Sequence, residues 1–180
     1  MKTVLVPLAN GFEEIEAIAI IDVLRRAGID VVVAGIPGKI VKGAHQINIT
    51  ADTKLEDVKN ESFDAIILPG GDPGYKNLLK SNLILNLVKR YDQGGKLVAA
   101  ICASPMVLAK AGVLNNRLAT IYPGMERDIP KPRDGKVVRD GNIITSQGPG
   151  TAMEFALALV EYLEGKDAAD KLARVLVFRA

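Results

Sequence analysis

Several short runs of apolar residues in this chain show no alternation with polar residues. They predict strands over 3–8, 30–36, 65–68, 97–101, 118–121 and 142–146. Strands that are apolar on both sides are typical of a parallel sheet covered by helices on both faces. The strand pattern therefore predicts a mostly parallel sheet inside a sandwich of helices.

Longer stretches with helical spacing separate these runs and predict helices over 13–27, 75–91, 105–111 and 151–163. Thr53 with Glu56, and Thr151 with Glu154, have the spacing of a capping box at a helix start. A hairpin turn is expected at Asp140. Strands that alternate with helices in this way predict a doubly wound α/β fold.

The 180 residues are 48% hydrophobic, which suits one continuous core, and we expect a single domain over 1–180. The formal charge of +2 and an aromatic content of 4% give no support for a nucleic-acid partner. Apolar runs stay below the roughly 18 residues that a membrane helix needs. We therefore expect a cytoplasmic protein with no membrane partner.

Candidate chemistry begins with Cys102, the only cysteine. It lies between the 97–101 strand and Pro105, which suits a first helical turn, so we expect a sharp strand-to-helix elbow. A helix N-terminus would lower the pKa of the thiol, and small neighbours, Ala103 among them, would admit a ligand. The alternative is a buried core cysteine.

The composition gives little support for a metal or cofactor site. A single cysteine excludes an intrachain disulfide and a multi-thiolate metal site, and the single histidine, His45, excludes a two-histidine site. We therefore predict no metal and no cofactor. A lone loop histidine such as His45 is usually solvated.

Acidic residues open the first predicted helix. Glu16 is surrounded by apolar residues, so burial would favour its protonated form and make it an acid/base or thiol partner. For Glu13 and Glu14, the simpler interpretation is that they complement the helix dipole.

Two glycine-containing segments follow predicted strands. Gly70 and Gly71 could present backbone N–H groups to an oxyanion, or could only form a tight turn. Gly148 and Pro149 could shape a pocket wall, or could only lead into a helix.

Five segments in a fixed order make the chain resemble the ThiJ/PfpI superfamily, in particular the branch of the parkinsonism-associated protein deglycase and glutathione-independent glyoxalase. The segments are 11–16, 22–28, 68–71, 99–103 and 145–151. The resemblance covers nearly the whole chain. It implies a flavodoxin-like fold, similar to that of class I glutamine amidotransferases.

The resemblance also implies roles for individual residues. Cys102 matches the nucleophile, Glu16 the carboxyl group beside it, and Gly70 and Gly71 the oxyanion donors. Family members are commonly homodimers in which the loop around His45 reaches toward the partner's active site.

Two departures from the family pattern bear on function. Ala103 stands where the protease-like branch has a histidine, which counts against a cysteine peptidase. Tyr122 stands where some deglycase-branch members have a histidine, and its hydroxyl could act in place of that group.

The resemblance therefore implies a glyoxalase or deglycase that acts on α-oxoaldehydes such as methylglyoxal, or on their early adducts with proteins. A hemithioacetal at Cys102 would be the intermediate. Nucleic acid would enter only as a glycated substrate. The alternatives are a redox-sensing protein oxidised at Cys102 and, with less support, an intracellular cysteine peptidase.

Overall fold

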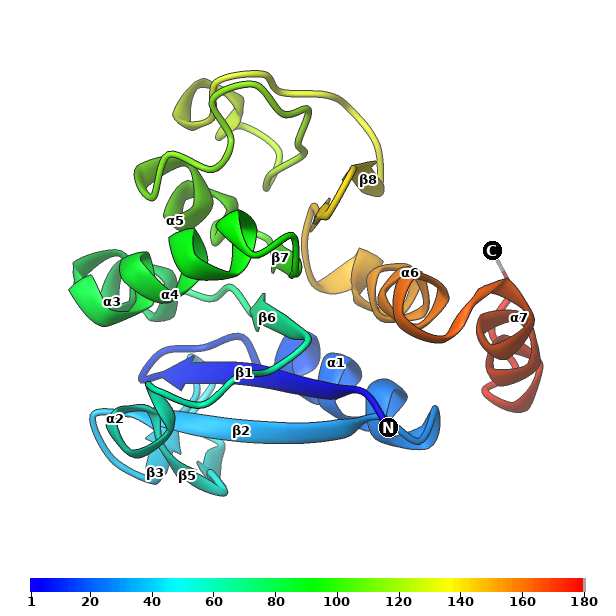
Figure 1. Cartoon of the computed structure of the whole chain (residues 1–180), viewed down its shortest axis with the longest axis horizontal. Helices are drawn as coiled ribbons and strands as arrows, with labels where there is room; N and C mark the ends of the chain where they lie inside the picture. Colours follow the sequence, from blue (N-terminus) through cyan, green and yellow to red (C-terminus); the bar gives the residue numbers. More distant parts are fainter. Residues whose placement is uncertain (180) are drawn as a thin grey trace.

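A computed structural model describes residues 1–179 and contains a seven-stranded sheet, with strand order β5-β2-β1-β6-β7-β9-β8 (Figure 1). Neighbouring strands are parallel, except that β8 runs antiparallel to β9. A separate antiparallel hairpin joins β3 and β4. The strands are β1 (Thr3–Ala9), β2 (Asp30–Ile36), β3 (Ile40–Lys42), β4 (Asn48–Thr50), β5 (Thr53–Lys54), β6 (Ala65–Leu68), β7 (Leu97–Ile101), β8 (Val137–Asp140) and β9 (Ile143–Ser146).

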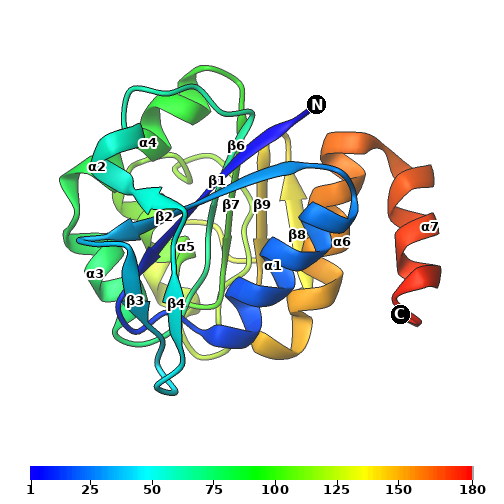
Figure 2. The ribbon, with the colours of Figure 1, turned by 90° about the horizontal axis from the view of Figure 1, so that it is seen from below.

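Helices cover both faces of the sheet (Figure 2). One layer contains α1 (Glu14–Arg26) and α6 (Ala152–Glu164), with α7 (Lys166–Val175) packed against α6. The other layer contains α2 (Leu55–Val58), α3 (Gly74–Lys80), α4 (Asn82–Gln93) and α5 (Pro105–Lys110). Two short 3₁₀ helices span Glu126–Asp128 and Pro149–Thr151.

Each layer has its own apolar core because successive residues of a strand point to opposite faces. In β1, Val4 and Val6 belong to the core under α1 and α6, whereas Leu5 belongs to the core on the other face. This arrangement confirms the doubly wound α/β fold expected from the strand pattern. None of the helices within residues 1–179 combines the length and the apolar character needed to cross a membrane.

The strand predicted over 118–121 is wrong. Ala119 forms only one isolated bridge, to Pro132, and the N–H of Thr120 donates instead to Thr145 Oγ1 at 2.9 Å. The bridge consists of two main-chain bonds, from the Ala119 N–H to the Lys131 carbonyl at 3.2 Å and from the Arg133 N–H to the Ala119 carbonyl at 2.8 Å.

The long helix predicted over 75–91 is divided into α3 and α4. Ser81 adopts an extended backbone between them, and its Oγ accepts from the N–H of Ile84 at 3.3 Å. A serine that caps a helix start competes with the continuous helix.

Neither predicted capping box forms. Thr53 lies in β5, and α2 begins after it without a side-chain cap. Thr151 Oγ1 accepts from the N–H of Gly148 at 3.1 Å and does not cap α6. The elements not predicted from the sequence are β3, β4, β5, α7 and the two 3₁₀ helices.

The strand order reverses direction between β1 and β6. The chain leaves β1 into α1 on one face and leaves β6 into α3 and α4 on the other. Ligands of doubly wound sheets bind outside the carboxyl ends of the strands at such a point. The segments after β1, β6 and β7 therefore define the region to examine.

Candidate active site

Cys102 follows β7 directly and has a left-handed backbone, with φ of +63°. Its N–H donates to the Ser146 carbonyl at 3.0 Å, and its own carbonyl accepts from the N–H of Tyr122 at 2.9 Å. A left-handed conformation costs a residue other than glycine about 1–2 kcal/mol. The predicted elbow is therefore present, and main-chain bonds to two other segments hold it in this strained conformation.

Ser104 connects the elbow to the loop after β6. Its side chain is completely buried, and its Oγ donates to the carbonyl of Pro69 at 2.6 Å. From the sequence, Ser104 is only one of the small residues beside Cys102. A hydroxyl that follows a candidate nucleophile by two residues was the available signal, but its partner depends on the tertiary fold.

Gly70 lies between the two residues predicted to carry the chemistry. A Cβ atom at this position would be 2.5 Å from Cys102 Cβ and 2.9 Å from Glu16 Oε2. Only a residue without a side chain fits there. The cysteine and the glutamate thus meet across a glycine backbone.

The backbone N–H groups of this loop have different partners. The N–H of Gly70 donates to Glu16 Oε2 at 2.8 Å, so it is not free for an oxyanion. The N–H groups of Gly71 and Ala103 instead lie near the Cys102 sulfur. The oxyanion role predicted for Gly70 therefore does not fit this geometry, whereas Gly71 and Ala103 remain candidates.

Glu16 is completely buried. Burial raises its pKa to about 7, against opposing hydrogen bonds from Gly70 and Cys102. Its Oε1 is the one buried side-chain nitrogen or oxygen without a hydrogen-bond partner within residues 1–179. The carboxyl group is therefore available both as a proton donor and as a proton acceptor near neutral pH.

The prediction that the pKa of Cys102 is lowered is wrong. Burial, and next the charge of Glu16, raise the pKa of this thiol to about 12, although the N–H groups of Gly71 and Ala103 act in the opposite direction. The helix that follows, α5, has only six residues. A thiolate at Cys102 and a carboxylate at Glu16 repel each other, so the pair favours a state in which only one of the two groups is ionised.

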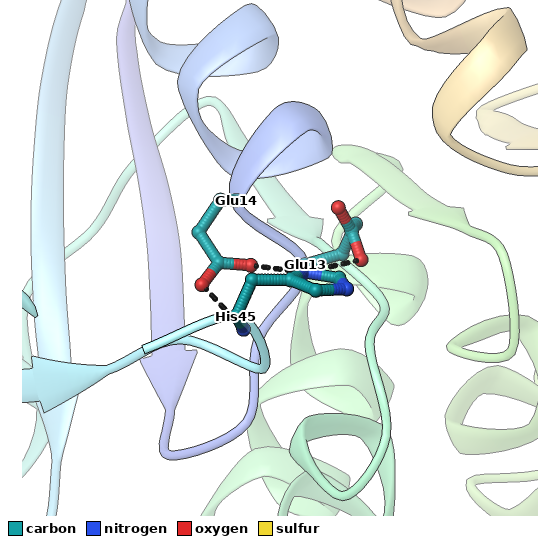
Figure 3. Close-up of side chains that lie close together, drawn as sticks. All are labelled: Glu13, Glu14 and His45. Carbon is teal, nitrogen blue, oxygen red and sulfur yellow. Dashed lines mark hydrogen bonds and ion pairs between the residues drawn. The ribbon is translucent and has the colours of Figure 1, made fainter. Parts of the chain in front are cut away.

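Glu14 fixes the loop that contains His45 (Figure 3). Its carboxylate accepts from the N–H of His45 at 2.7 Å, from the N–H of Ile47 at 3.4 Å and pairs with His45 Nδ1 at 2.9 Å. Burial raises the pKa of Glu14, but these hydrogen bonds outweigh it and the pKa is lowered. Glu14 therefore does more than complement the helix dipole, the role that the sequence suggested.

A lone loop histidine is expected to be solvated, but His45 is solvated only in part. Its side chain is 70% exposed, but Nδ1 faces Glu14 and lies 3.6 Å from Glu13 Oε2. The hydrogen bond to Glu14, with the charges of both carboxylates, raises the pKa of the imidazole. No sequence signal links residue 45 with residues 13 and 14, because the β3–β4 hairpin brings them together.

Tyr122 and Gly148 lie side by side near the elbow. Tyr122 is 47% exposed, and its ring would be 3.4 Å from a Cβ atom on Gly148. Pro149 begins the short 3₁₀ helix that follows. Tyr122 donates its N–H to the Cys102 carbonyl, so it connects Gly148 and Pro149 with the elbow. The functional roles of these three residues stay predictions.

Comparison with known proteins identifies the family. Residues 2–162 match the DJ-1/PfpI family. This chain belongs to the DJ-1/PfpI family. Among its DJ-1 relatives, Protein dj-1beta of Drosophila melanogaster is 46% identical, with 98% of this chain and 97% of the relative covered. The resemblance inferred from the five segments is thus confirmed.

Two further relatives of this DJ-1/PfpI protein bear on structure and activity. The solved structure of oxidized Toxoplasma gondii DJ-1 has a TM-score of 0.97, 41% identity and full coverage of both chains. Glutathione-independent glyoxalase DJR-1.2 of Caenorhabditis elegans is 43% identical, with 91% of this chain and 89% of that protein covered. Enzymatic activity therefore occurs within the DJ-1/PfpI family.

Proposed function

We propose that this protein is a cysteine-dependent glyoxalase or deglycase. It converts α-oxoaldehydes such as methylglyoxal into 2-hydroxy acids, or releases the free amine and a 2-hydroxy acid from their early adducts with proteins, without glutathione, metal or cofactor. The observation that carries the proposal is the pairing of Cys102 on its elbow with the buried carboxyl group of Glu16. The glyoxalase name of one relative supports the same chemistry.

The first step joins the Cys102 sulfur to the aldehyde carbon. The thiol proton passes to Glu16, the carbonyl oxygen becomes an oxyanion, and protonation of that oxyanion gives a hemithioacetal. The N–H groups of Gly71 and Ala103, which lie near the sulfur, stabilise the developing charge. Gly70 acts indirectly, through its hydrogen bond to the glutamate.

The second step moves a proton between adjacent carbons. Glu16 removes the proton from the carbon bonded to sulfur and returns it to the neighbouring ketone carbon, while the hydroxyl proton of the hemithioacetal moves to the former ketone oxygen. The first carbon is thereby oxidised to a thioester and the second is reduced to an alcohol. Water then hydrolyses the thioester, which releases the 2-hydroxy acid and restores the thiol.

The test is methylglyoxal consumption and lactate formation by purified protein in the absence of glutathione and in the presence of a chelator. We expect turnover by the parent protein and none by Cys102→Ser or Glu16→Gln, with circular dichroism showing that both variants are folded. Full activity in Glu16→Gln would remove the acid/base role. Absence of turnover by the folded parent protein would remove the glyoxalase proposal.

Tyr122 is the accessory residue best placed to contact substrate, since it is half exposed beside the Cys102 carbonyl. Gly148 and Pro149 would form the adjacent wall. If the Tyr122 hydroxyl binds substrate, Tyr122→Phe should raise KM while preserving the rate of thiol alkylation at Cys102. Unchanged kinetics would limit Tyr122 to a packing role.

A redox-sensing function is the second candidate. Glu16 Oε1 has no partner within residues 1–179, so in its protonated form it could donate a hydrogen bond to an oxygen on the Cys102 sulfur. Mild peroxide, as the oxidant, should add two oxygen atoms to Cys102 and leave the protein folded. A constant intact mass under those conditions would count against this function.

We expect the protein to act as a homodimer in the cytoplasm. Ile15 and Ile18 on α1 are 59% and 50% exposed, and Ile47, in the loop bound by Glu14, is 58% exposed. An apolar patch of this kind suits a second copy of the chain. Light scattering should give twice the chain mass, and Ile18→Glu should give monomers; a monomeric parent protein would contradict the proposal.

A further inference from the structure

The geometry points to a binding site for a divalent first-row transition-metal ion of the Zn²⁺ class, formed by Glu13, Glu14 and His45 (Figure 3). The site is separate from the Cys102–Glu16 pair, and it does not depend on the reaction proposed above. Two of the ligands open α1, and the third comes from the loop after β3.

The ligand atoms have suitable spacing. His45 Nδ1 lies 2.9 Å from Glu14 Oε2 and 3.6 Å from Glu13 Oε2, and all three atoms lie within 4.8 Å of one another. Nitrogen and oxygen ligands of a tetrahedral zinc ion, each about 2.0–2.1 Å from the metal, are about 3.3 Å apart. The observed distances bracket that value, so small side-chain movements suffice to bind an ion.

Within residues 1–179, Glu13 shares its one ion-pair partner, His45, with Glu14. The residue is only 9% exposed, yet its carboxylate accepts no hydrogen bond within residues 1–179, and its nearest cationic group is His45 Nδ1 at 3.6 Å. A buried carboxylate normally has a hydrogen-bond donor or a counter-charge. A dication bound between Glu13 and Glu14 would supply that charge.

Glu14 is already held in the orientation that ligation requires. Its Oε1 accepts from the N–H groups of His45 and Ile47, which leaves Oε2 directed at the imidazole. Such outer hydrogen bonds fix the direction of a ligand and strengthen metal binding.

The ligand set selects the class of ion. One imidazole with two carboxylates suits zinc, cobalt or nickel, whereas calcium takes six to eight oxygen ligands and magnesium binds mainly to oxygen. Three protein ligands leave a fourth position for water.

The experiment uses Zn²⁺ alone and full-length protein without a histidine tag, in a Cys102→Ser background so that no thiolate competes for the ion. His45 is the only histidine, so ¹⁵N-histidine labelling reports on that ring without assignment. After chelator treatment and dialysis, titration should reveal one ion per chain and a shift of the Nδ1 resonance.

The variants test each ligand. His45→Ala should abolish specific binding, and Glu13→Gln should weaken it about tenfold or more, a loss of the size seen on disturbing metal sites. Glu13→Gln is the safer variant for folding, because the Glu13 carboxylate makes no hydrogen bond within residues 1–179. Glu61→Gln, at an exposed acidic residue elsewhere, is the matched control and should bind as the parent protein does.

The outcomes separate cleanly. An absence of Zn²⁺ binding at micromolar concentrations by the folded parent would overturn the proposal. So would binding that survives His45→Ala, an Nε2 shift in place of the Nδ1 shift, or equal affinities of the Glu13→Gln and Glu61→Gln variants. Circular dichroism and thermal unfolding of each variant establish that any lost affinity reflects a lost ligand.

Discussion

The left-handed backbone of Cys102 predicts an unusual response to glycine. At most positions, glycine is less stable than alanine because the unfolded chain gains freedom and a methyl group is lost. At Cys102, with φ of +63°, glycine also relieves the conformational cost that any other side chain carries. We therefore compare Cys102→Gly with Cys102→Ala, both of which lack the sulfur.

The expected magnitudes follow from three contributions. Relief of the left-handed conformation is worth about 1–2 kcal/mol. Added freedom of the unfolded chain costs about 0.5–1 kcal/mol, and the lost methyl group costs about 0.8 kcal/mol. The free energy of unfolding of Cys102→Gly should therefore lie within about 1 kcal/mol of that of Cys102→Ala.

Ala103 provides a matched control in the next position. It is 5% exposed and is not among the residues with positive φ, so glycine there relieves no strain. Adding Ala103→Gly to Cys102→Ala should cost about 1.3–1.8 kcal/mol.

Urea unfolding of the three proteins, analysed with a common m-value, gives the comparison. The two glycine substitutions should differ by about 1–2 kcal/mol in their effect. If glycine at position 102 costs as much as glycine at position 103, the elbow stores no conformational strain and the reasoning fails.

Three other substitutions have defined outcomes. Ser104→Ala leaves the buried Pro69 carbonyl without its donor and should lower the free energy of unfolding by about 1–3 kcal/mol, measured in urea; an unchanged value would contradict this. A hydrogen bond from the Thr3 N–H lowers the pKa of Asp64, whose side chain is 40% exposed. The stability that this carboxylate contributes is therefore present above its pKa in the unfolded chain, and it is lost as the pH falls through its pKa in the folded protein. Asp64→Asn should therefore cost under about 1 kcal/mol at pH 7 and almost nothing at acid pH, and a cost independent of pH would refute the assignment. Gly71→Ala introduces a side chain at φ of +100°, so its thermal midpoint should fall and alkylation of the elbow thiol should slow; normal values for both would contradict the packing.

The sheet and the candidate pair of Cys102 and Glu16 were predictable because their signals are local. Unbroken apolar runs mark the buried strands, and a cysteine between a strand and Pro105 marks the elbow. Glu16 was conspicuous because its neighbours in the sequence are apolar. Short elements such as β5, with two residues, carry too little pattern to be recognised.

Features that depend on distant contacts were not predictable. The raised pKa of Cys102 results from burial and from Glu16, neither of which the elbow motif reveals. The roles of Glu14 and His45 arise only when the β3–β4 hairpin folds back over the start of α1. A helix-dipole interpretation of Glu14 was the best local inference, and the tertiary fold added a larger interaction to it.

The order of strands also affects how copies of the protein meet one another at high concentration. The outer strands of the large sheet are β5, with two residues, and β8, with four. Unpaired main-chain groups on an edge strand act as a template for strand addition and aggregation. Edges this short offer few such groups, so the fold limits fibril-like association through its main sheet while its long, apolar strands stay in the interior.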